Sequence, residues 1–220
     1  EGYTEIDGEC YYQSDLDVLY SLISNSNIEI DLLELGYQIW NDGRLTTLSC
    51  EGEYENGELV GFGLNGDIPS EIGNLDQLQY LYLSWNDYTG EIPSSIGSLE
   101  NLHRLNLNNN LLEGDIPSEI GDLSNLHYLD LRNNRLTSIP ESIVNLSNLT
   151  LDYNWGITLG NNSFYCEGGE QNISLIPESV ISFCEQFNGS GGLFDQTCSL
   201  CDEGYVELWG ECYTITFTTY

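Results

Sequence analysis

Hydrophobic and polar positions recur with a fixed period through the middle of the chain. The dipeptide Ile-Pro occurs at residues 68–69, 92–93, 116–117 and 139–140, so that successive copies stand 24, 24 and 23 residues apart. A constant period of this length is the signature of a solenoid, in which each repeat forms one turn and stacks on the next. The pattern therefore predicts a short stack of turns.

Every turn contains a stretch in which leucine alternates with polar or aromatic residues. The alternating pairs are Leu81 and Leu83, Leu105 and Leu107, and Leu129 and Leu131. Alternation with a period of two is typical of a strand with one buried face. We expect these strands to stack into a parallel sheet.

Two further features of the repeat predict how its turns close. Asn86, Asn110 and Asn134 each stand three residues after the second leucine, and we expect their buried amides to bond the backbone of neighbouring turns. The segment Pro-Ser-Xaa-Ile-Gly predicts a short helical or 3₁₀ turn that begins near its proline. Its glycine, at position 73, 97 or 121, is expected to end that turn with a positive φ.

The shared pattern L-x-x-L-x-L-x-x-N-x-L-x-G-x-I-P resembles the plant-type leucine-rich repeats of plant receptor-kinase ectodomains and polygalacturonase-inhibiting proteins. The resemblance covers about residues 55–155. It implies an α/β solenoid of about four repeats, with a parallel β-sheet on the concave face, a helical N-terminal cap and a disulfide-rich C-terminal region. Towards the end of the array the pattern degrades, and we expect Asn154 to finish a shortened last unit.

The flanks divide the chain into further segments. We expect an N-terminal cap at 1–54, repeats at 55–158, a C-terminal cap and linker at 159–192, and a small cysteine-rich segment with a terminal strand at 193–220. Residues 14–50 resemble the N-terminal cap of plant-type repeats, with a helix followed by Trp and Cys. The residues expected to cap that helix are Ser14 or Asp15, and those expected on its apolar face are Leu16, Leu19, Tyr20 and Ile23.

Charge narrows the range of partners. The 220 residues contain four Lys+Arg, all arginine, against 36 Asp+Glu, which gives a formal net charge of −32. So acidic a chain excludes nucleic acid and anionic membrane surfaces as partners. No stretch approaches the ~18 consecutive apolar residues of a membrane span, so we expect no membrane insertion. The start at Glu1 indicates a processed or excised piece.

The seven cysteines lie in the two end regions, which suggests stapled caps and an oxidising, extracellular location. Connectivity cannot be fixed from the sequence. The expected pairs are Cys10 with Cys50, Cys166 with Cys184, and Cys201 with Cys212, leaving Cys198 free or intermolecular. Five sequons are candidates for glycosylation in a eukaryotic source: Asn145, Asn148, Asn161, Asn172 and Asn188.

The two ends of the chain have similar sequences. The stretch EGYTEIDGECYY at 1–12 recurs as EGYVELWGECYT at 203–214. Either the chain is one module of a longer tandem array, or subunits join end to end at equivalent joints. The tail that follows alternates threonine with apolar residues and is a candidate assembly strand, which pairs with an exposed sheet edge of its own chain or of a neighbour. Its residues are Thr214, Ile215, Thr216, Phe217 and Thr218.

The sequence gives little sign of catalytic or metal chemistry. His103 and His127 should lie about 5 Å apart on adjacent strands, but no acidic residue or cysteine shares their column, so we expect a polar ladder and no metal. Residues 28–36 resemble the second half of a calcium-binding helix-loop-helix without its Asp-rich first half; calcium is the one cofactor left open. There is no phosphate-binding loop and no nucleophile in a strained turn, so we do not expect an enzyme.

The remaining candidate is the surface of the sheet. Aromatic residues and arginine, which are enriched in binding hot spots, gather at its outward positions. The candidate binding residues are Tyr80, Tyr82, Trp85, His103, Arg104, Asn106, His127, Tyr128, Asp130 and Arg132. The first functional hypothesis is a secreted structural or adhesive module that assembles with itself into a filament. The alternative is a monomeric recognition domain that binds an extracellular protein or glycan on its concave face.

Overall fold

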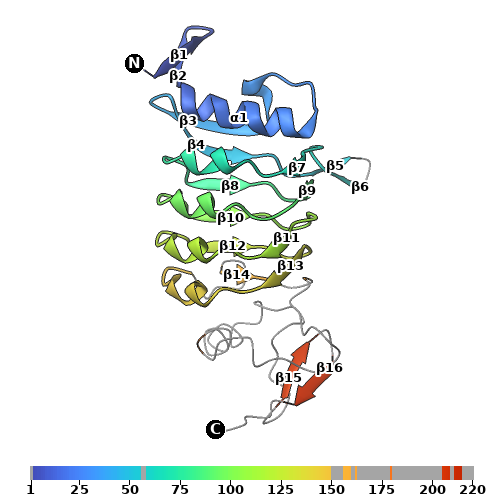
Figure 1. The fold of residues 1–220 in the computed structure, drawn as a ribbon. Coiled ribbons are helices and arrows are strands. Elements are labelled where there is room, and N and C mark those ends of the chain that lie inside the picture. The colour runs from blue at the N-terminus through green and yellow to red at the C-terminus, as the bar shows by residue number, and fades with distance from the viewer. Residues whose placement is uncertain are drawn as a thin grey trace.

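The predicted turns stack along one axis beneath an N-terminal cap (Figure 1). The computed structural model describes residues 2–55, 58–149, 156–159, 162, 179, 205–208 and 211–214. The cap consists of the antiparallel hairpin β1 (Tyr3–Ile6) and β2 (Glu9–Tyr12), helix α1 (Gln13–Ser26), the 3₁₀ turn η1 (Leu32–Glu34) and strand β3 (Tyr37–Asn41). Together these elements cover the open end of the solenoid core.

Helix α1 differs from its prediction at its start and on one face. Its N-cap is Tyr12, in an extended conformation without a side-chain cap bond, and Asp15 is fully buried inside the first turn. Leu16 and Leu19 are buried as expected, but Tyr20 is 65% exposed. The buried face is centred near Leu19, and Tyr20 lies roughly 100° further around the helix axis.

Six strands form the main sheet. They are β3, β4 (Arg44–Ser49), β8 (Tyr80–Tyr82), β10 (Arg104–Asn106), β12 (Tyr128–Asp130) and β14 (Ile157–Thr158). All neighbours pair in parallel except β3 with β4, which are antiparallel. The parallel sheet is confirmed, and it begins with β4, inside the segment that the sequence assigned to the cap.

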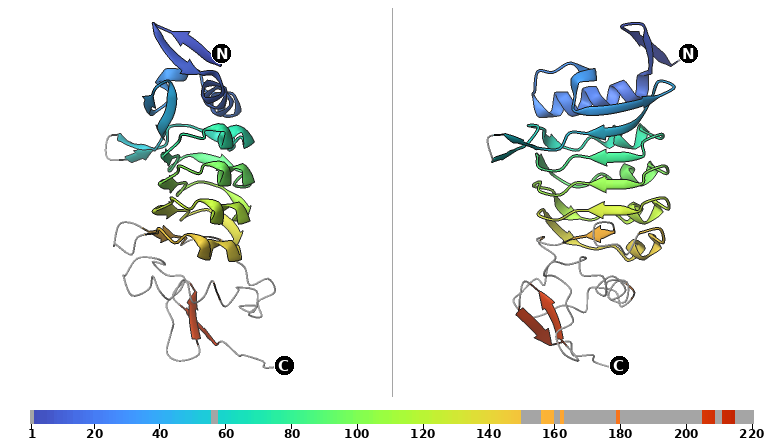
Figure 2. Two further views of the ribbon diagram at one scale, coloured as in Figure 1. Left: turned by 90° about the vertical axis from the view of Figure 1, so that its left-hand side faces the viewer. Right: turned by 180° about the vertical axis from the view of Figure 1, so that it is seen from behind.

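The other sides of each turn carry 3₁₀ helices and short strands. The 3₁₀ helices are η2 (Ser70–Asn74), η3 (Ser94–Ser98), η4 (Ser118–Asp122) and η5 (Glu141–Asn145). The strands β7 (Asn65–Asp67) and β9 (Asp87–Thr89) pair with each other, as do β11 (Glu113–Asp115) and β13 (Arg135–Ser138). A hairpin of β5 (Glu53–Glu55) and β6 (Glu58–Val60) projects from the first turn on the side of the main sheet (Figure 2).

The repeat glycines are required for a reason other than the predicted one. Gly73, Gly97 and Gly121 do not have positive φ. A Cβ atom on Gly73 would instead lie 2.6 Å from the carbonyl oxygen of Ser95 in the next turn, and the other two glycines meet the following turn in the same way. Glycine is needed here because adjacent 3₁₀ helices approach each other too closely for a side chain.

The asparagine prediction is confirmed. In Asn110, Nδ2 donates to the carbonyl of Leu83 at 3.0 Å, and Oδ1 accepts from the backbone N–H of Tyr88 at 3.1 Å. Asn86 and Asn134 repeat this arrangement. Asn162 continues it: its Oδ1 accepts from the Leu136 N–H and its Nδ2 donates to the Leu131 carbonyl. Asn154, which was expected to finish the last unit, lies outside the described residues. The last unit is four residues longer than the period, which shifts its buried amide along the chain.

Leucine and isoleucine columns fill the interior. The buried core runs without interruption from Val18 in α1 to Leu159 after β14. Burying one such side chain contributes about 1.5–3 kcal/mol, so each turn is stabilised mainly by its neighbours. Tyr88 occupies the column that Leu64, Leu112 and Leu136 share, and its ring is completely buried.

The terminal echo in the sequence is also a repeat of structure. Hairpin β15 (Tyr205–Leu208) and β16 (Glu211–Thr214) pairs Glu207 with Cys212, just as β1–β2 pairs Glu5 with Cys10. The two hairpins lie at opposite ends of the solenoid (Figure 1). Residues 215–218 of the candidate assembly strand lie outside the described residues.

The structure does not form the expected Cys10–Cys50 bond. Both thiols are free, Cys10 exposed and Cys50 buried. The backbone of Cys10 lies against Gly43, before β4 begins, whereas Cys50 follows the end of β4. The length of that strand, roughly 20 Å, separates them. Cys166, Cys184, Cys198 and Cys201 lie outside the described residues, as does the side chain of Cys212.

Residues 28–36 do not form half of a calcium-binding helix-loop-helix. They contain only the three-residue 3₁₀ turn η1, and Gln38 Nε2 donates to the carbonyls of Leu32 and Leu35, both at 2.8 Å. The segment packs into the cap through apolar side chains such as Ile28 and Ile30. A second helix, which that motif requires, is not formed here.

Candidate binding surface

The solvent side of the main sheet, which we call the sheet face, carries side chains in rows that cross the strands. The first row is Ile39, Thr47, Tyr80, Arg104 and Tyr128. The second row is Tyr37, Ser49, Tyr82, Asn106 and Asp130. The rows show that the face extends onto the cap strand β3, which the sequence analysis did not include.

The half of the sheet face nearest the cap is aromatic and apolar. Tyr37 is 64% exposed, Ile39 42% and Trp85 44%, while Tyr80 and Tyr82 are half-buried. We call these five residues the aromatic half; four of them lie in β3 and β8, and Trp85 is three residues beyond the end of β8. Tyr37 and Ile39 were missed because β3 precedes the repeats, although the alternation in its sequence, Tyr-Gln-Ile-Trp-Asn, is a strand signal.

Four rings form a continuous stack along the sheet face. The centroids of Tyr82 and Tyr80 are 6.4 Å apart, those of Tyr80 and His103 6.0 Å, and those of His103 and His127 5.4 Å. The two histidine rings are within 4° of parallel, as the predicted ladder requires. Separations of this size are typical of offset rings, so the stack presents ring edges, parts of ring faces and polar tips to a ligand.

The polar tips of this stack have defined roles. The Nδ1 of His103 lies 2.7 Å from the carbonyl oxygen of Asn101, so we assign the proton to Nδ1 and leave Nε2 as an acceptor. The guanidinium of Arg104 lies 5.8 Å from the centroid of the Tyr80 ring. The middle of the face thus combines an imidazole acceptor with a cation held against an aromatic ring.

In the half of the sheet face nearest the C-terminal end, polar side chains form hydrogen bonds with one another. Asp130 is completely buried and accepts from Asn108 Nδ2 at 2.9 Å, Tyr128 Oη at 3.0 Å and Arg132 Nη2 at 2.7 Å. Burial raises the pKa of the Tyr128 phenol, and the Asp130 carboxylate raises it further, so Tyr128 remains a donor. Asn106 Oδ1 accepts from Asn108 in the same network.

The predicted site residues therefore separate into two groups. Tyr80, Tyr82, Trp85, His103, Arg104, His127, Tyr128 and Arg132 are at least partly exposed. Asn106 and Asp130 are buried, at 8% and 0% exposure, and serve the structure of the sheet face rather than contact with a ligand. Their outward position is as predicted, but the hydrogen-bond network around them removes them from solvent.

Glu51 belongs to the sheet face although the sequence analysis passed over it. Its Oε1 accepts from Ser84 Oγ at 2.6 Å and from Asn106 Nδ2 at 2.8 Å. Glu51 follows β4 and is half-buried. Within the described part of the chain it forms no ion pair. A lone glutamate outside the clean repeats gives no sequence signal of this placement.

Trp85 has an unusual backbone for its residue type. Its φ is 57°, in the left-handed region, where the equivalent residues of the next two turns are Asn109 and Asn133. Those two asparagines bond each other, Asn133 Nδ2 to Asn109 Oδ1 at 2.7 Å. Asparagine tolerates this conformation and a bulky residue does not, so the tryptophan is held in strain.

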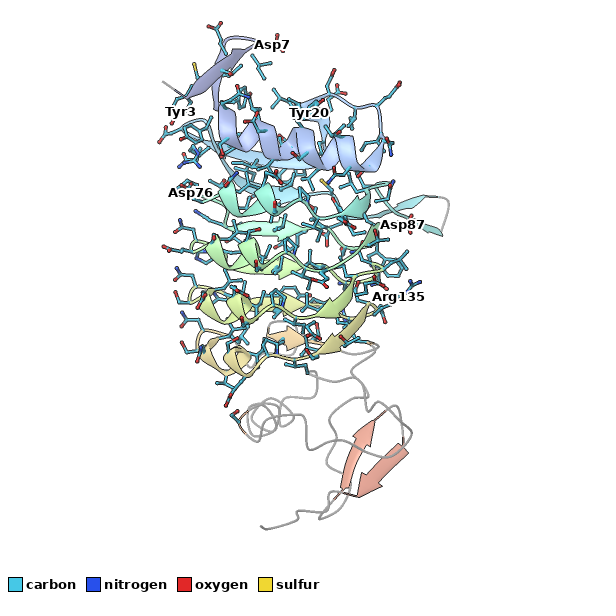
Figure 3. The ribbon with its side chains drawn as sticks, viewed as in Figure 1. Tyr3, Asp7, Tyr20, Asp76, Asp87 and Arg135 are labelled. Atoms are coloured by element: carbon cyan, nitrogen blue, oxygen red, sulfur yellow. The ribbon has the colours of Figure 1, made fainter. Side chains whose placement is uncertain are left out.

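The opposite side of the stack has a polar ladder of its own. Asn101, Asn125 and Asn148 each donate from Nδ2 to a carbonyl of the preceding turn, at 2.7, 2.8 and 2.6 Å. The Asn148 sequon therefore has its amide occupied, whereas Asn145 is exposed on η5. Figure 3 places Asp76 on this helical side, and Asp87 and Arg135 on the side of β9 and β13. Asn161, Asn172 and Asn188 lie outside the described residues.

Neither a metal centre nor a membrane helix emerges from the described residues. Across those residues no three His, Cys, Asp or Glu side chains gather in a group that could hold a metal ion. The helices of the same residues are too short or too polar to cross a bilayer.

The repeats match known families and structures. Residues 77–99 match the family model described as Leucine Rich Repeat, and residues 100–148 match that described as Leucine Rich repeats (2 copies). No curated protein matches the chain.

Three ectodomains from Arabidopsis thaliana are among the solved structures that match this chain. That of the receptor kinase SOBIR1 is 27% identical, with a TM-score of 0.55, over 84% of this chain and 91% of its own. The BIR2 ectodomain is 28% identical, with a TM-score of 0.54, over 67% and 80%. For the GASSHO1/SCHENGEN3 ectodomain, at 43% identity and a TM-score of 0.41, the match covers 46% of this chain and only 12% of that one.

Proposed function

Because residues 77–148 are leucine-rich repeats on a solenoid similar to plant receptor ectodomains, we propose that this protein is a non-catalytic module that binds another protein through its sheet face. The aromatic half carries this proposal. Aromatic side chains in a solvent-facing cluster are the residue type that dominates binding hot spots. The likeness to SOBIR1 and BIR2 supports an extracellular or cell-surface location.

The strain at Trp85 supports the same proposal. A tryptophan in a left-handed turn that asparagine occupies in the next two turns lowers stability without adding to the core. Strained residues cluster at functional sites, where the fold around them supports their conformation.

A display experiment tests this function. Binders selected from a random peptide library on the immobilised protein should lose at least about 10-fold in affinity on Trp85→Asn and on Tyr82→Ser, measured by titration calorimetry. Glu119→Gln, which changes a half-buried carboxylate on the η4 turn of the helical side, is the control and should leave affinity unchanged. Selected binders that are insensitive to both sheet-face variants would overturn the proposal.

End-to-end assembly is a second candidate, supported by the shared register of the β1–β2 and β15–β16 hairpins and by the exposed Cys10 thiol. In this hypothesis an oxidant of the extracellular space links Cys10 of one subunit to a C-terminal cysteine of the next. Non-reducing gels should then show a ladder that Cys10→Ser removes. A single monomer band from the oxidised wild-type protein would refute this candidate.

A further inference from the structure

We infer that Glu51 is the specificity-determining residue of the sheet face, and that it selects a partner segment bearing a lysine or arginine side chain. This inference rests on the proposed function, because it names the chemistry of the partner that the sheet face binds. It is carried by the position of the Glu51 carboxylate and by the absence of a cation beside it within the described residues.

The carboxylate lies on the binding surface itself. Glu51 follows β4, yet its Oε1 reaches Asn106 in β10, two strands away in the sheet. Its side chain therefore passes over the residues that follow β8, where it also accepts from Ser84. Tyr82 is the register partner of Asn106, and Trp85 follows Ser84 in the chain. The anion thus lies at the boundary between the aromatic half and the half that contains Asn106.

Among the described residues, the two fully buried carboxylates each have an arginine. Asp15 is completely buried and pairs with Arg44, whose Nε lies 3.0 Å away. Asp130 is completely buried and pairs with Arg132. Glu51 is half-buried and holds only two neutral donors, Ser84 and Asn106, among the described residues.

Because Glu51 has no arginine among the described residues, a ligand could supply the positive charge. A partly desolvated carboxylate with neutral donors still gains from an opposite charge, and that gain is larger than at a fully hydrated surface. An incoming lysine or arginine would complete at Glu51 the pairing that Arg44 and Arg132 provide elsewhere. Its methylene stem would pack against Tyr82 and Trp85, a contact that does not depend on the charge.

The net charge of the whole chain also favours a basic partner. With a formal net charge of −32, the protein attracts basic segments over long range and repels acidic ones. That field brings cations to the entire surface, whereas the Glu51 carboxylate would fix one of them at a single point. The two effects differ in salt dependence, because only the long-range field is strongly screened.

The test is a double-mutant cycle on peptides selected from the random library and washed at about 0.5 M salt, where the Debye length falls to roughly 4 Å. The enriched peptides should share a lysine or arginine next to an apolar residue. Glu51→Gln, which keeps both hydrogen bonds to Ser84 and Asn106, should weaken their binding by about 10-fold. Replacing the peptide cation with norleucine should weaken wild-type binding equally and leave binding to Glu51→Gln unchanged.

The controls separate this inference from the proposed function. Glu119→Gln removes the same charge from the helical side and should not alter binding at this ionic strength. If Trp85→Asn abolishes binding while Glu51→Gln and the norleucine peptide have no effect, the sheet face binds but the charge selection is refuted. If selected peptides lack a cation, the inference fails in the same way. If neither Trp85→Asn nor Glu51→Gln affects binding, both proposals fail.

Discussion

Trp85 and Asn109 occupy equivalent positions in successive turns, with φ values of 57° and 53°. The backbone requirement is the same at both positions, but the side chains differ in their ability to meet it. Asn109 accepts a hydrogen bond from Asn133 at this position, so the asparagines form a ladder that the tryptophan interrupts.

Trp85→Asn should therefore stabilise the protein while it impairs binding. An asparagine relieves the left-handed strain and can extend the ladder to Asn109, so we expect the free energy of unfolding to rise by about 0.5–1 kcal/mol. Urea titration followed by circular dichroism measures this change. Trp85→Ala is the matched control, because it removes the ring but keeps the unfavourable backbone, and should bind poorly without a gain in stability. A loss of stability in Trp85→Asn would contradict the assignment of strain.

The Asp15–Arg44 pair predicts a large effect of a small substitution in the cap. Asp15 accepts from Arg44 Nε at 3.0 Å and from the Leu45 N–H at 2.8 Å, and it has no exposed side-chain surface. Asp15→Asn leaves Arg44 without its buried counter-charge, and should lower the free energy of unfolding by about 3 kcal/mol.

The control for this variant lies in the same ion cluster. Asp76 also contacts Arg44, but its side chain is 61% exposed, so Asp76→Asn should cost less than about 1 kcal/mol. Chemical denaturation of both variants in one buffer tests the contrast. Equal effects would mean that burial does not set the strength of these interactions.

The buried asparagines predict a second contrast, between the two ladders. Asn110→Ala removes the partner of the Tyr88 N–H and a donor to the Leu83 carbonyl, inside the core. The Leu83 carbonyl keeps its bond from Asn86, but the buried Tyr88 N–H is left unpaired, which together with the lost bonds should cost about 3 kcal/mol. Asn101→Ala removes a bond to the exposed Asp76 carbonyl, where water can substitute, and should cost about 0.5 kcal/mol. Thermal unfolding of the two variants measures the difference.

The two free thiols of the cap should react very differently. Exposed Cys10 should be alkylated by iodoacetamide in the native protein, whereas Cys50 should react only after unfolding, because burial raises its pKa from 9.0 to about 12. Peptide mapping by mass spectrometry distinguishes them. Recovery of a Cys10–Cys50 linked peptide would show instead that the pair forms.

The same thiol predicts a loss of stability at alkaline pH. Above about pH 9 the unfolded state releases the Cys50 proton while the folded state retains it, so stability falls as pH rises towards 12. Between about pH 8 and pH 10.5, the reduced wild-type protein should lose about 2 kcal/mol more than Cys50→Val, which has no proton to release. Urea titrations at the two pH values test this difference, and parallel losses in both proteins would refute it.

The elements that repeat could be predicted from the sequence, because each copy shows the same residue type at the same strand position or bend. Leu81, Leu105 and Leu129 define one strand position three times, and the asparagine amides define one bend in the same way. The structure confirms both. Features that occur once could not be found by this comparison. Asp15 is an example, because an acidic residue near a helix start has a simpler explanation as a cap.

The binding surface was predictable only where it coincided with the repeats. The strand pattern of the repeats predicts the positions of Tyr80, Tyr82 and Arg104. Tyr37 lies on the sheet face because β3 pairs antiparallel with β4, and β3 is not part of a repeat. The burial of Asp130 was also hidden from the sequence. Its outward position predicts exposure, and only the contacts of Asn108, Tyr128 and Arg132 remove it from solvent.

The stacked asparagines allow the length of the solenoid to change in steps of one turn. Asn86, Asn110 and Asn134 join their turns to the preceding ones through the same pair of backbone bonds, so any joint can be duplicated without redesign. One extra turn inserted after Asn110 would lengthen the stack by about 4.8 Å and leave the aromatic half untouched. The number of turns would then set the distance between the aromatic half and the last turn of the solenoid.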